Sequence, residues 1–113
     1  MTPAQFLHVL AMTESTDNPE AWGDHGHAVG RWQVHPDWLW GWARHFSIEP
    51  MLNEAWDAFI SRVIARFFTW HTTELGPIEI AMKFHLGHES HQGAPDWDLP
   101  YAQRFIRYAG GVE

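Results

Sequence analysis

Glu14 is the side chain whose position in this sequence best suits acid–base chemistry. It lies at the end of an apolar segment that contains Phe6 and Leu10, and a glycine-rich stretch follows it directly. Hydrophobic neighbours can keep a carboxyl group protonated at neutral pH, which a general acid requires. The alternative is a solvated carboxylate at a helix end, the usual environment of a single glutamate. The sequence therefore indicates a candidate general acid at Glu14.

Histidines suggest a second chemistry, a metal site. His25 and His27 flank a glycine, and His85, His88 and His91 recur every three residues. Zinc needs three or four ligands in a near-tetrahedral cluster. His88 and His91 are one residue too close for the His-Glu-x-x-His pattern of zinc peptidases. We therefore expect neither a metal nor another cofactor, and a zinc-dependent hydrolase is the less favoured alternative.

Helices must position these side chains, because their start and stop signals divide most of the chain. Proline or a capping residue opens each segment, and apolar residues recur within it at three- and four-residue steps. The predicted helices span residues 3–15, 36–46, 50–70 and 77–87, and a last helix runs from Asp98-Leu99-Pro100 to Gly110-Gly111. The helix 50–70 is expected to be the central helix of the core. Residues 15–30 are predicted to form an irregular loop. Apolar and polar residues do not alternate over any length, so the domain is expected to be mainly helical.

Length and composition indicate one mainly α domain that spans residues 1–113. The chain has 45% hydrophobic residues and includes eight Trp, seven Phe and two Tyr, which is too much apolar surface for a disordered chain. It has no cysteine, so neither a disulfide nor a thiolate metal site can form. Most tryptophans must pack in the core, and Trp56 and Trp70 are expected there. The tryptophans proposed as stacking platforms for sugar rings are Trp22, Trp32, Trp38 and Trp97.

Charge and hydropathy exclude several partners. The net charge is −7 with histidine neutral, so a nucleic-acid backbone would be repelled. No apolar run approaches the roughly 20 residues of a membrane span, and no basic residue precedes an apolar stretch at the N-terminus. We therefore expect no nucleic-acid binding, no membrane insertion and no secretory signal in this chain.

The residues around Glu14 form an ordered set that resembles a known family. They are Glu14-Ser15, Asn18-Pro19, Trp22-Gly23-Asp24-x-Gly26 and Gly30-x-x-Gln33-Val34. This set resembles the first motif of the lysozyme-like lytic transglycosylases, and its glycine loop is especially similar to that of goose-type lysozymes. A weaker match lies downstream, where Phe84-His85-Leu86-Gly87 takes the place of the family's Tyr-Asn-Ala-Gly, and Tyr101 begins a segment similar to the family's terminal helix.

The resemblance implies a lysozyme-like helical fold with the glycine-rich loop at the active site. It also implies cleavage of the β-1,4 bond between N-acetylmuramic acid and N-acetylglucosamine in peptidoglycan. Glu14 would be the catalytic acid. Asp24 would activate water if the enzyme is a lysozyme, and the muramyl 6-hydroxyl would attack if it is a lytic transglycosylase. Asp24 could equally be a turn aspartate that bonds its own loop.

The same resemblance implies which residues contact the glycan strand. They are Ser15, Trp22, Gly30, Trp32, Gln33, Val34, Phe84, His85 and Tyr101. Two of them depart from the family, because Phe84 lacks the tyrosine hydroxyl that members direct toward the catalytic glutamate and His85 replaces an asparagine. A non-catalytic wall-binding module of the same fold is the main alternative. We expect a monomer that acts in the periplasm or at the cell wall, either in a phage virion or as an endolysin released by a holin.

Overall fold

The first helix, α1 (Pro3–Ser15), has the bounds that the sequence predicts. The Thr2 side chain accepts a hydrogen bond from the N–H of Gln5, and the Gln5 side chain accepts one from the N–H of Thr2, which makes a capping box. The helix ends because Thr16 adopts a left-handed conformation, with φ of 53°. These features come from a computed structural model, which describes residues 1–88 and 97–110.

A small antiparallel sheet follows α1, within the segment where the sequence predicts an irregular loop. Strands β1 (Trp22–Gly23) and β2 (Ala28–Val29) pair Trp22 with Val29 and Gly23 with Ala28. The short 3-10 turn between them, η1 (Asp24–Gly26), includes left-handed backbone at Gly26, with φ of 88°. Strands of two residues are too short to show an alternation of apolar and polar residues, so the spacing of residues does not indicate this sheet.

Helices α2 (Pro36–His45) and α3 (Trp56–His71) pack against each other. The first agrees with the predicted helix 36–46, but the second begins at Trp56 rather than at Pro50. In the intervening segment Asn53 is left-handed, with φ of 63°, and the N–H of Met51 donates to the Glu54 carboxylate. A right-handed helix cannot pass through such a residue, so the proline start signal is followed by a turn instead.

Arg62 of α3 holds this turn in place, and the ion pair gives a testable pH dependence. Its Nε and Nη2 donate to the Glu54 carboxylate at 2.7 and 2.8 Å. Hydrogen bonds from Arg62 and then from the Met51 N–H lower the pKa of Glu54 from 4.5 to about 2. The folded state therefore favours the charged form. The stabilisation is complete above pH 4.5 and is lost as the pH falls toward about 2.

We expect Glu54→Gln to lower the free energy of unfolding at pH 7 and to have little effect near pH 2. Urea unfolding of both proteins at the two pH values measures this. Glu20→Gln is the control, because Glu20 is exposed and carries no such pair in the described structure. An equal loss of stability at both pH values would contradict the role of the Glu54 charge.

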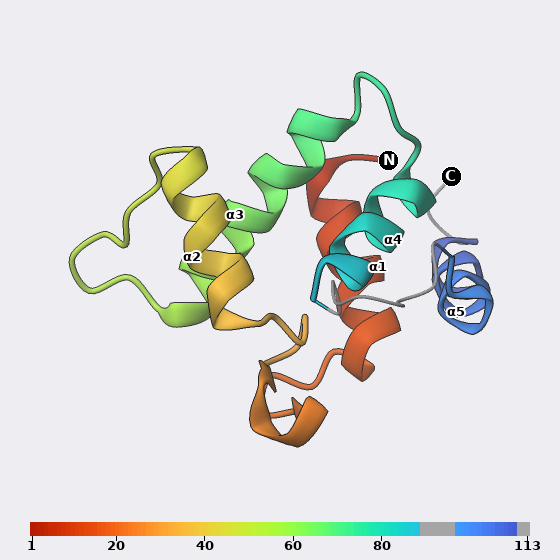
Figure 1. Ribbon diagram of the computed structural model, residues 1–113, viewed down its shortest axis with the longest axis horizontal. Helices are drawn as coiled ribbons and strands as arrows, with labels where there is room; N and C mark the ends of the chain where they lie inside the picture. The colour runs from red at the N-terminus through yellow and green to blue at the C-terminus, as the bar shows by residue number, and fades with distance from the viewer. Residues whose placement is uncertain (89–96, 111–113) are drawn as a thin grey trace.

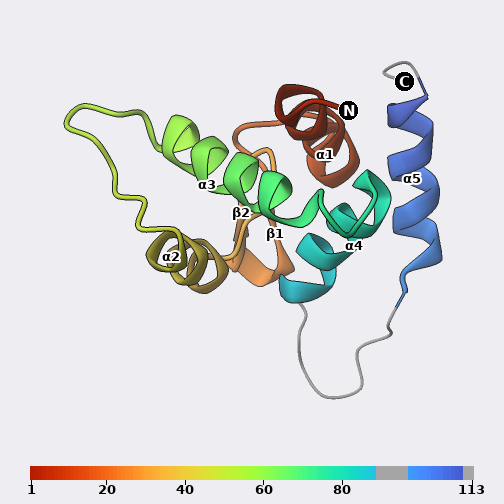
Figure 2. The ribbon, with the colours of Figure 1, turned by 90° about the horizontal axis from the view of Figure 1, so that it is seen from above.

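Helices α4 (Pro77–His88) and α5 (Leu99–Ala109) pack against each other at one end of the molecule (Figure 2). The α5 start is confirmed: Asp98 is its N-cap, and its side chain accepts a hydrogen bond from the N–H of Tyr101 at 3.1 Å. Helix α4 continues one residue beyond Gly87, the predicted end. A Cβ at Gly87 would lie 3.4 Å from the Trp38 ring, so this glycine allows α2 to approach α4 closely.

Helix α1 lies between α3 and α5 and packs against both (Figure 1). The largest fully buried side chains come from all five helices and are Tyr101, Phe6, Phe59, Phe67, Phe84, Phe105, Leu10, Leu39, Ile60, Ile64, Ile80 and Val9. The described residues thus form a compact, single-domain, mainly α protein with five helices and one two-stranded sheet. None of these helices has the length and apolar character needed to cross a bilayer.

Candidate active site

Glu14 lies in the last turn of α1, and its side chain is only 8% exposed. The helix has this orientation because Phe6, Val9 and Leu10 are completely buried on its inner side. Glu14 follows Leu10 by four residues, so it lies next to the buried face of the helix. The carboxyl group is thereby held at the edge of the core, as the sequence predicts for a general acid.

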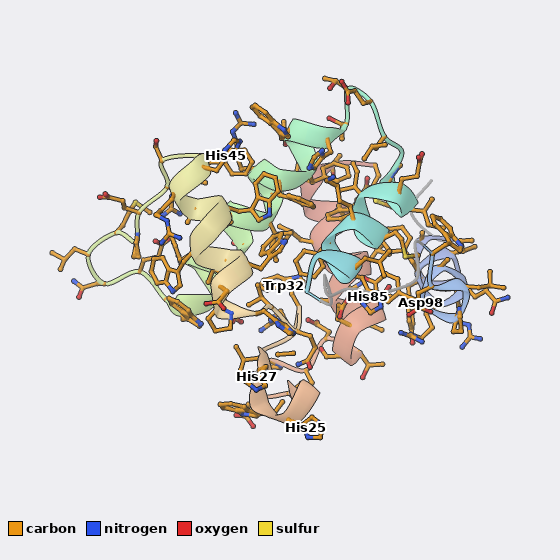
Figure 3. The ribbon with its side chains drawn as sticks, in the orientation of Figure 1. His25, His27, Trp32, His45, His85 and Asp98 are labelled. Carbon is orange, nitrogen blue, oxygen red and sulfur yellow. The ribbon has the colours of Figure 1, made fainter. Side chains whose placement is uncertain are left out.

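His85 of α4 brings a second titratable group to Glu14. Its Nδ1 lies 3.8 Å from Glu14 Oε2, and its Nε2 lies 3.0 Å from Asp98 Oδ2 at the start of α5. Figure 3 shows His85 and Asp98 pointing toward each other between these helices. The imidazole ring therefore lies between two carboxyl groups that are far apart in the sequence.

Tyr101 of α5 completes the group. Its ring stacks on the His85 imidazole, with ring centres 3.9 Å apart and planes 10° apart. Burial raises the pKa of Tyr101 well above its usual range, and the negative charge of nearby Glu14 raises it further. The phenol therefore remains protonated, and its buried hydroxyl has no hydrogen-bond partner among the described residues.

Asp98 holds His85 and Tyr101 together. Partial burial raises its pKa, but hydrogen bonds from the Tyr101 N–H and from His85, with the charges of His85 and Arg104, lower the pKa below its ordinary value overall. Asp98 is therefore a carboxylate at neutral pH. One oxygen caps α5 and the other fixes the orientation of the imidazole, since a ring hydrogen-bonded at Nε2 cannot turn freely.

Glu14, His85, Asp98 and Tyr101 together suit proton transfer at Glu14. Low exposure raises the free energy of a charged carboxylate, so it favours the protonated form of Glu14. Once the proton has been given up, the unpartnered Tyr101 hydroxyl could turn to donate to the carboxylate, and His85 could stabilise the negative charge when its imidazole is protonated. This is the behaviour required of one group that acts first as an acid and then as a base.

Tyr101→Phe tests the contribution of the phenol. It removes a hydroxyl group that could donate to the carboxylate formed when Glu14 loses its proton, so it should move the alkaline limb of the pH–rate profile of any Glu14-dependent reaction to higher pH. The free energy of unfolding should change little, because the hydroxyl has no hydrogen-bond partner among the described residues. Tyr108→Phe, on the last turn of the same helix, is the control. An unchanged profile in Tyr101→Phe would show that the hydroxyl does not act on Glu14.

Four predicted glycan contacts are instead packed in the core: Trp32, Val34, Phe84 and Tyr101. Trp32 donates from its indole Nε1 to the carbonyl of Leu7 at 2.9 Å. Side chains with so little exposure cannot line a groove, so we assign all four to packing, with Tyr101 acting on Glu14 from within.

Ser15, Gly30 and Gln33 organise the loop after α1. The Ser15 hydroxyl donates to the carbonyl of Arg31 at 2.7 Å, which ties the helix end to the loop. Gln33 Nε2 donates to the Gly30 carbonyl at 2.9 Å, and a Cβ at Gly23 would clash with Gln33 Oε1. The Gln33 amide therefore holds the loop against the sheet, which is the alternative to a sugar contact.

The other tryptophans that were predicted to stack on sugar rings differ in exposure. Trp22 is 74% exposed and Trp97 is 45% exposed. Trp38 packs edge-on against Phe84, with ring centres 4.7 Å apart, and lines a cavity of about 360 Å³ with Trp42. The prediction that Trp56 and Trp70 pack in the core is wrong, because about half of each side chain is exposed.

Two predictions fall on parts that the structure does not describe. The side chain of Asp24 is outside the described part, so its role remains a prediction. The same is true of the His88 side chain and of His91, on which the zinc alternative depends. His25 and His27 are exposed on the turn after β1 (Figure 3). Within the described residues, no three His, Asp or Glu side chains are grouped to bind a metal ion.

Asp98 is the residue of this group that sequence reasoning missed as a functional residue. The sequence indicated it only as a helix start, and nothing in its spacing predicts contact with His85, 13 positions earlier.

Comparisons with protein-family models, curated proteins and solved structures found no match.

Proposed function

We propose that this protein is a lysozyme-like enzyme that cleaves the β-1,4 bond between N-acetylmuramic acid and N-acetylglucosamine in peptidoglycan. The proposal rests mainly on one observation: the shielded Glu14 carboxyl group, at the end of an apolar helix, lies 3.8 Å from the His85 imidazole and close enough to the buried Tyr101 phenol for its charge to raise the pKa of that phenol. The glycine-rich turn that follows α1 and the resemblance of the motif around Glu14 support the same function.

In the proposed reaction Glu14 first acts as an acid. It donates its proton to the glycosidic oxygen while the bond between that oxygen and the anomeric carbon breaks, and an oxocarbenium-like centre develops. The leaving sugar keeps the proton as a hydroxyl group. Glu14 is then a carboxylate that can remove a proton from the incoming nucleophile, which returns the enzyme to its starting state.

Tyr101 and His85 are proposed to position and tune Glu14 rather than to touch the sugar. Tyr101 takes on the task that the family resemblance assigns to a tyrosine at position 84, where this sequence has Phe84. The hydroxyl group would thus act on the carboxyl group from α5 instead of from α4. His85 is held by Asp98, so its Nδ1 is kept near Glu14 through both proton transfers.

Two nucleophiles are compatible with this arrangement. Attack by the muramyl 6-hydroxyl gives a 1,6-anhydro sugar, whereas attack by water gives a reducing end. In the second route Asp24, instead of Glu14, would take the proton of the attacking water, and both carboxyl groups would then return to their starting states by proton exchange with solvent, so Asp24→Asn should slow this route strongly. The first route needs no second carboxylate, and Asp24→Asn should then leave the rate almost unchanged.

Digestion of purified peptidoglycan tests the proposal directly. We expect muropeptides whose muramyl ends are either anhydro or reducing, two products that differ in mass by one water and are separated by mass spectrometry. A chelator should not change the yield, since no metal takes part in the proposed steps. Products cut in the peptide stems, or no new ends at all, would contradict the proposal.

A further inference from the structure

A cavity of about 280 Å³ lies between the two-stranded sheet and the start of α3. Its lining includes Trp22, Val29, Gly30, Trp56, Asp57 and Ile60. None of Glu14, His85, Asp98 and Tyr101 lines it, so this cavity is separate from the candidate active site. Its size is just below the usual range for sites that hold drug-sized ligands, and it would suit a single ring.

Two exposed indole rings flank the cavity, and the protein supports each of them. Trp22 is 74% exposed, and its ring lies over Gly26, where a Cβ would come within 3.8 Å of it. Trp56 is 48% exposed, with Trp40 and Phe59 at ring-centre distances of 5.8 and 5.6 Å. Rings that are already supported lose less conformational entropy when a ligand binds, so both are suited to stacking.

A fixed carboxylate supplies the polar side of the cavity. Asp57 Oδ2 accepts a hydrogen bond from Arg31 Nε at 3.0 Å, and Arg31 Nη1 donates to Asp17 at 2.9 Å. A carboxylate can accept several hydrogen bonds, so Asp57 retains capacity for hydroxyl donors on a ligand. Two carboxylates around one guanidinium leave this edge net negative, which disfavours an anionic ligand.

We propose that this cavity binds one neutral pyranose ring of a wall glycan, such as an N-acetylglucosamine residue. A pyranose ring has an apolar face that can stack on an indole and hydroxyl groups at its edge that can donate to Asp57. The site would hold a glycan strand next to the sheet, outside the active site. It extends the proposed function to a second sugar site, but binding here does not depend on cleavage at Glu14.

Site-resolved binding to tri-N-acetylchitotriose tests this proposal. The full chain with Glu14→Gln is titrated with the trisaccharide, and the indole N–H signals of Trp22 and Trp56 are followed by nuclear magnetic resonance. We expect both signals to shift with one affinity. In Trp22→Ala, the affinity measured from the Trp56 signal should weaken by about tenfold or more. In Trp56→Phe, which keeps an aromatic ring, the affinity measured from the Trp22 signal should weaken by less than that.

Trp70→Ala is the matched control, because it removes an indole about as exposed as that of Trp56 on a different part of α3; it should leave the affinity unchanged. Absence of shifts at both indoles, or unchanged affinity in Trp22→Ala, would overturn the proposed site. Shifts that depend on protein concentration without sugar would overturn it in favour of self-association. Cleavage by Glu14→Gln at the wild-type rate would reject the proposed activity and leave this result intact.

Discussion

Glu14→Gln should clear purified peptidoglycan at least about a hundredfold more slowly than the wild-type protein. The change is almost isosteric, but an amide cannot donate the proton that the glycosidic oxygen needs, and loss of a general acid typically costs this much or more. The side chain is only 8% exposed, so solvent water should substitute for it poorly. The loss of optical density of a wall suspension gives the rate.

The control must show that only the proton has been lost. Circular dichroism and thermal unfolding should be nearly the same for both proteins, and both should bind intact walls equally. Glu20→Gln, which changes an exposed carboxyl group six residues along the chain, should retain the full rate. If the wild-type and Glu14→Gln proteins cleared walls equally, the enzyme proposal would be rejected. If neither cleared walls and both bound them, the chain would be a wall-binding module.

Much of the fold could be predicted because helix boundaries are set by local chemistry. Thr2 and Pro3 start α1, and Asp98 caps α5, since these residues supply acceptors or a suitable φ at a helix start. The start of α3 could not be found in this way. Pro50 is a valid start signal, but the contact between Glu54 and Arg62 stabilises a turn there instead.

The candidate site was only partly accessible to sequence reasoning. The position of Glu14 follows from the period of α1, so its burial could be predicted from apolar neighbours. The contact of His85 with Asp98, and the stacking of Tyr101 on His85, depend on how α4 and α5 pack. Such contacts between helices carry no signal in the spacing of a single sequence. The exposure of Trp56 was missed for the same reason, because the apolar period of α3 does not show where the neighbouring elements stop covering it.

Phe6→Ala should lower the free energy of unfolding by about 3–5 kcal/mol, a large share of the roughly 5–15 kcal/mol typical of a domain. Phe6 is completely buried in α1. Its ring stacks on Phe68 of α3, with ring centres 4.4 Å apart, and lies 6.1 Å from Phe105 of α5. The substitution thus removes packing among three helices at once and leaves a cavity that they cannot easily fill.

Urea unfolding at neutral pH measures this loss, with Ile106→Ala as the matched control. Ile106 is also a large apolar residue in a helix, but it is 59% exposed, so its truncation should cost about 0.5 kcal/mol or less. A cost below about 1 kcal/mol for Phe6→Ala would contradict the packing described. The same contacts hold α1 against α5, and therefore hold Glu14 near Tyr101. The folded fraction of Phe6→Ala should consequently lose wall-clearing activity as well, because a looser α1 no longer keeps the carboxyl group beside the phenol.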